Sequence, residues 1–182
     1  AGAEVPVDVP GELWVRPESP LMVLRGYHGL PEKTAETLVD GWVRTGDVFR
    51  RDAAGHFFFM DRKKDALRRR GENISSFEVE RALNAHPAVF ESAVIAVPSA
   101  LGEDEIKAVI VPRDGHAIDW VELTEFMNAR VPYFMVPRYF ESRDALPRTP
   151  TQKVQKHLLR AAGMGEGVWD REAAGIVLSR RT

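Results

Sequence analysis

The sequence contains no cysteine, which excludes disulfide bonds and chemistry by a thiolate. No apolar run approaches the roughly 20 residues that a membrane-spanning helix needs, and no basic-then-apolar leader precedes the first strand-like segment. The five histidines lie far apart in the chain and lack the spacing of metal ligands. From these absences we expect a cytoplasmic protein with no transmembrane segment and no metal site of its own.

A strong charge of one sign is also lacking, since 25 basic residues stand against 27 acidic ones and the net charge is −2. That balance argues against a general nucleic-acid binder. The length of 182 residues is enough for one ordinary domain, or for a small domain and a fragment of another. The hydrophobic content of 44% and the charged content of 29% are typical of soluble globular proteins.

The stretch from Asp61 to Glu80 joins two differently patterned parts of the chain. It begins as a turn dense in charge, predicts a short basic strand around Ala66 to Arg69, bends at Gly71 and then enters a helix. The spacing Ser-x-x-Glu at residues 75 to 78 is a capping box, which satisfies open backbone donors at a helix start. The apolar residues that follow recur at helical spacing. A run of basic residues such as this one is usually a solvated face or a nonspecific anion patch.

Two further segments bear residues suited to a nucleotide. In Trp42-Val43-Arg44-Thr45-Gly46-Asp47, the glycine allows a tight turn, and the carboxylate beside it can accept hydrogen bonds from the two vicinal hydroxyls of a ribose. The alternative is a turn aspartate that bonds to its own backbone. In Leu146-Pro147-Arg148-Thr149-Pro150-Thr151-Gln152-Lys153, the lysine has a long stem that suits contact with a phosphate. The alternative is an ordinary solvated lysine.

In this order and spacing, the three segments resemble the C-terminal motifs of the adenylate-forming superfamily. That superfamily includes acyl-CoA synthetases, the adenylation domains of peptide synthetases and firefly-type luciferases. The resemblance covers roughly residues 11 to 163, and three ordered motifs are far more specific than any one alone. Within the superfamily, the motif around Gly71 and the Trp169-Asp170-Arg171-Glu172 tail look most like those of fatty-acyl- or carnitine-type CoA ligases.

The resemblance implies a role for each matching position. Asp47 and Arg62 would bind the ribose of the nucleotide, and Lys64 would be the hinge about which a small domain rotates. Gly71, with Arg70 and Glu72, would line the tunnel for the pantetheine arm of coenzyme A. Lys153 would contact the substrate carboxylate and the α-phosphate during catalysis, although Gln152 stands where the family usually has glycine.

The resemblance also implies the reaction and its participants. The activity would be that of an AMP-forming acyl-CoA synthetase, in which a small-molecule carboxylate reacts with ATP to give an acyl-adenylate and the thiol of coenzyme A then displaces AMP. Mg²⁺ is implied by the family, with no ligand for it in this chain. Two alternative functions stay open: an adenylation domain of a peptide-synthetase-like enzyme, and a noncatalytic anion- or nucleotide-binding module. The chain could also form an oligomer.

The pattern of elements predicts an α+β fold in which a small C-terminal domain packs helices on a short mixed sheet. A helix with Pro31 in its first turn would end near Asp40-Gly41. Asp47 would begin the first strand of a hairpin, Val48 to Arg51, and the second strand would be His56 to Met60. Asp119 to Glu122 repeats the capping-box spacing at the start of a later helix.

A β-rich end of a large N-terminal AMP-binding domain would occupy residues 1–61, the mobile C-terminal domain residues 62–163, and a tail residues 164–182. The family's phosphate loop and acyl pocket would lie N-terminal to these motifs, and no such loop occurs here. We therefore expect the C-terminal part of a longer enzyme, inactive without the rest of its N-terminal domain.

Overall fold

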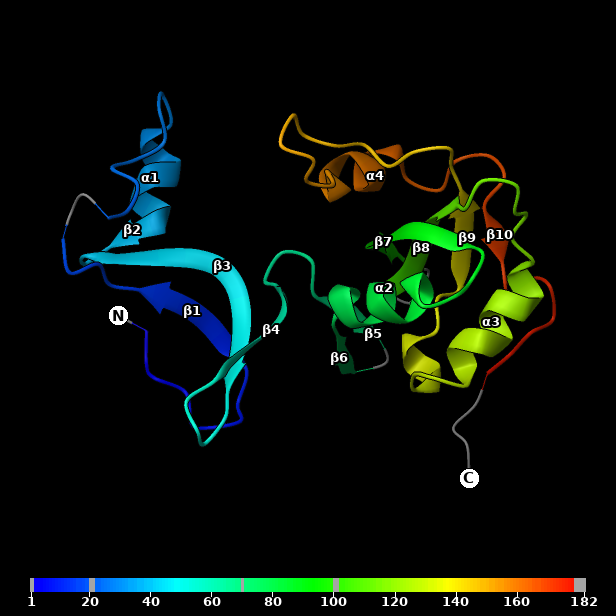
Figure 1. The fold of residues 1–182 in the computed structure, drawn as a ribbon, viewed down its shortest axis with the longest axis horizontal. Coiled ribbons are helices and arrows are strands. Elements are labelled where there is room, and N and C mark those ends of the chain that lie inside the picture. Colours follow the sequence, from blue (N-terminus) through cyan, green and yellow to red (C-terminus); the bar gives the residue numbers. More distant parts are fainter. Residues whose placement is uncertain (1, 20–21, 70, 100–101, 179–182) are drawn as a thin grey trace. The chain divides into compact units, whose positions relative to one another are not determined.

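The computed structural model describes residues 2–19, 22–69, 71–99 and 102–178 (Figure 1). The chain divides into two compact units, Ala1–Lys64 and Asp65–Thr182.

The first unit is an antiparallel sheet built around one long strand. Strand β3 (Trp42–Arg51) pairs with β1 (Gly11–Val15), with β2 (Leu38–Val39) and with β4 (Phe57–Arg62). The predicted hairpin between β3 and β4 is confirmed. Helix α1 (Pro31–Thr37) starts with the predicted proline.

The prediction that this helix continues to Asp40 and Gly41 is wrong. It ends at Thr37, because Leu38 and Val39 pair with β3 across a two-residue turn. Asp40 and Gly41 both have positive φ, 51° and 79°, which is the requirement of a type I′ hairpin turn. The local Asp-Gly signal therefore marks a strand pairing and not a helix end.

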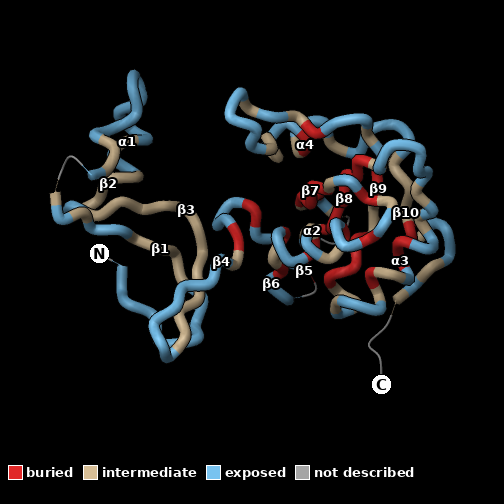
Figure 2. Tube along the Cα trace, viewed as in Figure 1, coloured by how far each residue is buried: buried red, intermediate tan, exposed pale blue. Residues whose placement is uncertain are grey.

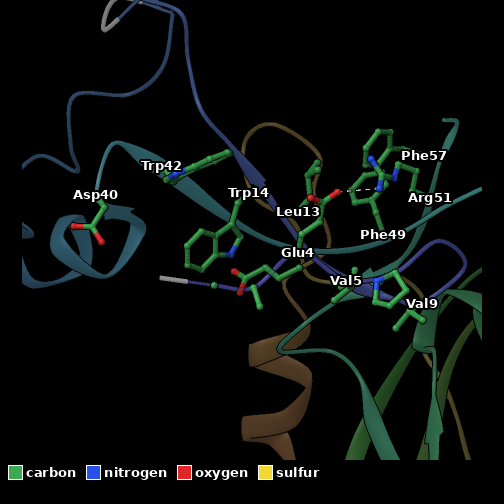
Figure 3. Close-up of a pocket in the computed structure, with 15 residues that line it drawn as sticks. Glu4, Val5, Val9, Leu13, Trp14, Asp40, Trp42, Phe49, Arg51 and Phe57 are labelled. Carbon is green, nitrogen blue, oxygen red and sulfur yellow. Dashed lines mark hydrogen bonds and ion pairs between the residues drawn. The ribbon is translucent and has the colours of Figure 1, made fainter.

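The first unit has little core of its own. All the fully buried apolar side chains of the described ranges lie between Leu67 and Leu159, and Figure 2 shows buried segments almost exclusively in the second unit. A hollow of about 660 Å³ is lined by the N-terminal segment, β1 and β3 (Figure 3). Phe57, which lines it, is 55% exposed, and Phe59 on β4 is 39% exposed. A sheet left this open is typical of one part of a larger domain.

The second unit is a small α+β domain on a mixed sheet, as predicted. The sheet has the order β10-β9-β8-β7, in which β8 and β9 are parallel and the other neighbours antiparallel. A two-stranded hairpin, β5 with β6, precedes helix α2. The elements are β5 (Leu67–Arg69), β6 (Glu72–Ile74), α2 (Ser76–Asn84), β7 (Val89–Pro98), β8 (Asp104–Pro112), α3 (Trp120–Asn128), a 3-10 turn (Tyr133–Met135), β9 (Tyr139–Ser142), α4 (Lys156–Ala162) and β10 (Trp169–Asp170).

Two apolar cores lie on opposite faces of this sheet. Successive residues of a strand point to opposite faces, and in β7 Val94 belongs to one core while Ala93 and Ile95 belong to the other. The first core is shared with α2, α3 and the β5–β6 hairpin. The second is shared with the segment that contains α4. Members of the first include Leu67, Ile74, Val79, Leu83, Leu123 and Phe140, and members of the second include Leu146, Val154 and Leu159.

Both predicted caps are confirmed. The hydroxyl of Ser75 accepts a hydrogen bond from the N–H of Glu78, and the carboxylate of Asp119 accepts from Val121 and Glu122. One prediction is corrected. The chain does not pass from Gly71 directly into a helix, because β6 comes first and returns along β5. The tail after Gly163, for which no strand was predicted, contains β10, which pairs with β9.

Candidate functional site

Asp47 and Arg62 form an ion pair in the first unit. They lie directly opposite each other in the pairing of β3 with β4, and Arg62 Nε is 3.1 Å from Asp47 Oδ1. The prediction that Asp47 begins a strand is wrong, since it lies within β3. Gly46, with φ 73°, lies in β3 where its register against β1 is irregular. A positive φ at an irregular point of a strand pair is typical of a bulge, and glycine adopts it without strain.

Hydrogen bonds hold the backbone of this bulge. The hydroxyl of Thr45 donates to the carbonyl oxygen of Leu13 at 2.8 Å and accepts from the N–H of Asp47 at 3.1 Å. The N–H of Gly46 donates to Glu12 Oε1 at 3.3 Å. The carboxylate of Asp47 is therefore presented from a fixed backbone. The Asp47 side chain is 28% exposed, so a ligand hydroxyl can reach its carboxylate.

Glu12 was not singled out from the sequence, yet it ties this region together. Its Oε2 lies 3.2 Å from Lys63 Nζ and 3.4 Å from Arg44 Nη2. Burial raises the pKa of Glu12, but hydrogen bonds from Lys63 and Trp14, together with the nearby cations, outweigh burial, so the pKa lies below its usual value. The two basic partners, Arg44 and Lys63, lie 32 and 51 residues away in sequence, so no local pattern could have revealed this role.

The chain is anchored on both sides of Lys64. The N–H of Lys63 donates to the carbonyl oxygen of Gly46 at 2.8 Å, which fixes residue 63 to the first unit. Asp65 is buried and forms an ion pair with Arg160 of α4, which fixes residue 65 to the second unit. Lys64 itself is exposed, and the two units divide directly after it. A rotation between the units would therefore be concentrated in very few backbone torsions, as at a hinge.

Gly71 lies in the turn between β5 and β6. Its φ is 78°, and a Cβ built on it would meet no heavy atom within 4 Å. Glycine is thus required here by backbone conformation, and the space above it is open. Glu72 follows on β6, exposed and opposite Arg69. Arg70, the third residue predicted for the pantetheine tunnel, lies outside the described residues.

Lys153 lies in a tight loop that precedes α4. The N–H of Lys153 donates to Thr149 Oγ1 at 3.1 Å, and the N–H of Thr149 donates back to the Lys153 carbonyl oxygen at 2.9 Å. The base of the loop is closed by a bridge between Arg148 and Val154. Gln152 has φ 65°, the left-handed conformation that glycine favours. Gln152 therefore adopts the backbone conformation that the family's usual glycine would favour, and the loop exposes the Lys153 side chain.

The hairpin and the loop lie on opposite faces of the second unit's sheet. Leu67 and Ile74 anchor the β5–β6 hairpin in the core shared with α2 and α3. Leu146 and Val154 anchor the Lys153 loop in the other core. The structure thus does not bring Gly71 and Lys153 together.

Within the part of the chain that the structure describes, no group of three or more metal-ligating side chains is present. No helix in the same ranges is long and apolar enough to cross a membrane.

Comparison with known proteins decides the family. Residues 78–153 match the model of the AMP-binding enzyme C-terminal domain. These residues therefore belong to the C-terminal domain of the adenylate-forming enzymes. It is 41% identical over 160 residues to a feruloyl-CoA synthase of Amycolatopsis, a match that covers 88% of this chain and 32% of that protein. It is 36% identical over 157 residues to a crotonobetaine/carnitine–CoA ligase of Proteus, covering 85% of this chain and 30% of the ligase.

Among solved structures, the anthranilate CoA ligase AuaEII in complex with anthranoyl-AMP is similar, with a TM-score of 0.80 and 30% sequence identity. That match covers 95% of this chain and 32% of the ligase. The chain therefore spans about a third of the length of the relatives it matches.

Proposed function

We propose that this chain is the C-terminal part of an acyl-CoA synthetase that converts a carboxylic acid, ATP and coenzyme A to an acyl-CoA, AMP and pyrophosphate through an acyl-adenylate. The observation that carries the proposal is the placement of two motifs on opposite faces of one small domain. Lys153 and Gly71 cannot serve one active site in a single orientation of that domain. A reaction in two steps, with a rotation between them, uses both faces in turn.

In the first step the carboxylate attacks the α-phosphorus of ATP, and the bond to pyrophosphate breaks. Lys153 would hold the carboxylate and the α-phosphate together and offset the negative charge that gathers between them. Asp47 would accept hydrogen bonds from the ribose hydroxyls, with Arg62 beside it. Mg²⁺, which the family resemblance implies, would help to neutralise the leaving pyrophosphate.

In the second step the thiol of coenzyme A attacks the acyl carbon, and AMP leaves. The second unit would have turned about Lys64, so that the hairpin with Gly71 lies where the Lys153 loop was. The open space above Gly71 would admit the pantetheine arm close to the backbone, and Arg70 and Glu72 would flank it. ATP and coenzyme A are both cytoplasmic metabolites, so we propose that the enzyme works there.

A larger N-terminal domain would complete the enzyme. Its presence is supported by the open sheet of the first unit and by relatives about three times as long. The segments of that domain would cover Phe57 and Phe59 and supply the phosphate loop and the acyl pocket.

The test uses the full-length enzyme and a panel of aromatic, fatty and carnitine-like carboxylates. Pyrophosphate release with ATP and one of these acids, followed by acyl-CoA formation when coenzyme A is added, is the expected result. The 182-residue chain alone should give no AMP above the blank. Pyrophosphate release with amino acids only would favour a peptide-synthetase adenylation domain, and nucleotide binding without pyrophosphate release would favour a noncatalytic module.

A further inference from the structure

Arg69 is a charged side chain enclosed in the second unit. It lies at the end of β5, two residues before Gly71, and only 1% of the residue is exposed. Its Nη1 donates to the carbonyl oxygens of Phe134 at 3.0 Å and Val136 at 3.2 Å. Its Nε lies 2.8 Å from Glu105 Oε2. A buried guanidinium in such a position needs this pairing, because an uncompensated buried charge is strongly destabilising.

The C-terminal segment Trp169–Ile176 lies next to Arg69. Arg138 donates two hydrogen bonds to Asp170, from Nε to Oδ1 at 3.0 Å and from Nη2 to Oδ2 at 2.8 Å. Arg171 is 1% exposed and donates to the carbonyl oxygens of Pro137 and Ile176. Figure 1 shows this segment beside β9 and α3. It is thus fixed to the domain by strand pairing and by two arginines.

Glu172 connects that segment to Arg69. Its Oε2 lies 3.2 Å from Arg138 Nη1, and its Oε1 lies 4.0 Å from Arg69 Nη2 and 3.4 Å from Arg171 Nη2. One carboxylate from the tail therefore lies within 4.0 Å of three guanidinium groups. One of these groups belongs to the strand that leads into the Gly71 turn. Nothing in the ligand roles predicted for the motifs requires this arrangement.

We propose that Glu172 is a positioning residue for thioester formation, and that Trp169–Ile176 is a latch that holds the β5–β6 hairpin through Arg69. The expected effect on the reaction with coenzyme A rests on the proposed function, whereas the expected effect on the rigidity of the hairpin does not. Arg69 cannot shift without leaving Glu105, Glu172 and two carbonyl oxygens. With Glu172 in place, the Gly71 turn is presented rigidly to the pantetheine arm. Without it, Arg69 keeps Glu105 and the two carbonyl oxygens but loses its second carboxylate. We then expect the hairpin to leave its position more often and to present a less ordered surface to coenzyme A.

The opposite-face arrangement makes the effect selective. The Lys153 loop is anchored in the other core, through Leu146 and Val154, and touches neither Arg69 nor the latch in the contacts described above. Loosening the hairpin should therefore leave acyl-adenylate formation almost unchanged. A variant that merely weakened the domain would reduce both half-reactions together.

The experiment compares Glu172→Gln with Glu166→Gln in the full-length enzyme. Glu166 is an exposed tail residue, so its variant makes the same change of charge outside the latch. For Glu172→Gln we expect kcat/KM for coenzyme A to fall about two- to thirtyfold, with the change mainly in KM, while pyrophosphate release stays within about twofold of wild type. Glu166→Gln should match wild type in both. Equal losses in the two half-reactions, or no loss in either, would overturn the proposal.

Amide hydrogen exchange on the same proteins gives a readout without activity. In Glu172→Gln, a peptide that spans β5 and β6 should exchange at least about threefold faster, while a peptide from α4 should be unchanged. If hairpin exchange in Glu172→Gln is unchanged, the latch proposal is wrong even if the enzyme is an acyl-CoA synthetase. If exchange is faster but the wild-type enzyme makes no acyl-CoA, the proposed function is wrong and the latch proposal stands. If Glu172→Gln does not fold, Glu172→Asp keeps the charge with a shorter reach and should show the same selectivity in smaller measure.

Discussion

Asp47 and Arg62 face each other across the β3–β4 pair, with Arg62 Nε 3.1 Å from Asp47 Oδ1. The two side chains are 28% and 47% exposed. An ion pair this open contributes about 0–1 kcal/mol to folding. The fold therefore depends little on this ion pair, and the carboxylate of Asp47 can be changed without unfolding the first unit.

Asp47→Asn in the full-length enzyme should weaken the use of ATP and leave folding almost unchanged. The amide keeps the size of the side chain but loses the charge, and a hydrogen bond to a charged group contributes about 1.5–3 kcal/mol. We expect kcat/KM for ATP to fall about tenfold or more, measured by pyrophosphate release. The control is Asp40→Asn, the same change at a turn whose positive φ asparagine tolerates. A wild-type kcat/KM in Asp47→Asn would remove Asp47 from the nucleotide site.

Lys64→Pro should impair thioester formation more than adenylation. Proline fixes φ and also restricts the residue before it, and here that residue is Lys63, whose N–H is held by Gly46. If the adenylation orientation is the one left accessible, the domain no longer turns to the second step. Lys64→Ala is the matched control, because it removes the side chain without fixing the torsion. Equal loss in both steps, or loss in Lys64→Ala as well, would show that residue 64 is not the pivot.

The sequence predicted those features that depend on neighbours in the chain. The caps at Ser75 and Asp119 are examples, since donor and acceptor lie within three residues. Strands β6 and β10 were missed because two or three residues carry no periodicity, and what defines them is a partner strand. In the same way, a run of basic residues predicts a solvated face. Arg69 is nevertheless buried, and its charge is paired with Glu105 and Glu172. These partners lie far along the chain, and only folding brings them together.

Gln152→Gly should raise the stability of the second unit slightly. A side chain in the left-handed conformation costs about 1–2 kcal/mol, and the φ of Gln152 is 65°. Glycine relieves that strain but loses about 0.4–1 kcal/mol through the greater freedom of the unfolded chain. We expect a net gain of about 0.5 kcal/mol in the free energy of unfolding, measured by urea denaturation. Gln152→Ala keeps the strain and should show no gain, and a clear loss of stability in Gln152→Gly would contradict this account.

The second unit should lose stability in acid through Asp170 and Glu141. Hydrogen bonds from Arg138, and then from backbone N–H groups, hold the pKa of Asp170 below its usual 3.8 despite burial. Burial raises the pKa of Glu141, but hydrogen bonds from Lys107 and Arg143 outweigh it and the pKa lies below 4.5. Because both values are lower in the folded state, the stabilisation is complete above about pH 4.5 and is lost as pH falls through the folded-state values.

Urea denaturation at pH 7, 5 and 3.5 measures this dependence. The free energy of unfolding should change little between pH 7 and 5 and fall at pH 3.5. In Asp170→Asn, which has no carboxyl to protonate at that position, the fall below pH 5 should be smaller. An equal fall in wild type and variant would show that Asp170 takes no part in the acid sensitivity.

Lys153→Ala in the full-length enzyme should cripple adenylation and spare thioester formation. The loop fixes the backbone of Lys153 through Thr149 while the side chain stays exposed, so the ammonium can be placed against the charge that moves across the α-phosphate. Removing one preorganised group of this kind costs about 2.7–4 kcal/mol, roughly 10²–10³ in rate. The structure adds the reason for selectivity, since the Gly71 hairpin that would serve the second step is anchored in the opposite core.

The measurement is two rates on one variant: pyrophosphate release from ATP and the acid, and conversion of supplied acyl-adenylate to acyl-CoA. Lys156→Ala is not a suitable control, because Lys156 Nζ lies 2.6 Å from Glu80 and supports α2. Thr151→Ser, in the same exposed loop, keeps the hydroxyl that lies 3.0 Å from Thr149 Oγ1 and should leave both rates near wild type. An adenylation rate of Lys153→Ala close to wild type would exclude the lysine from the chemistry. Equal loss in both steps would mean that the substitution damages the domain as a whole, since two faces of one sheet fail together only when their common scaffold does.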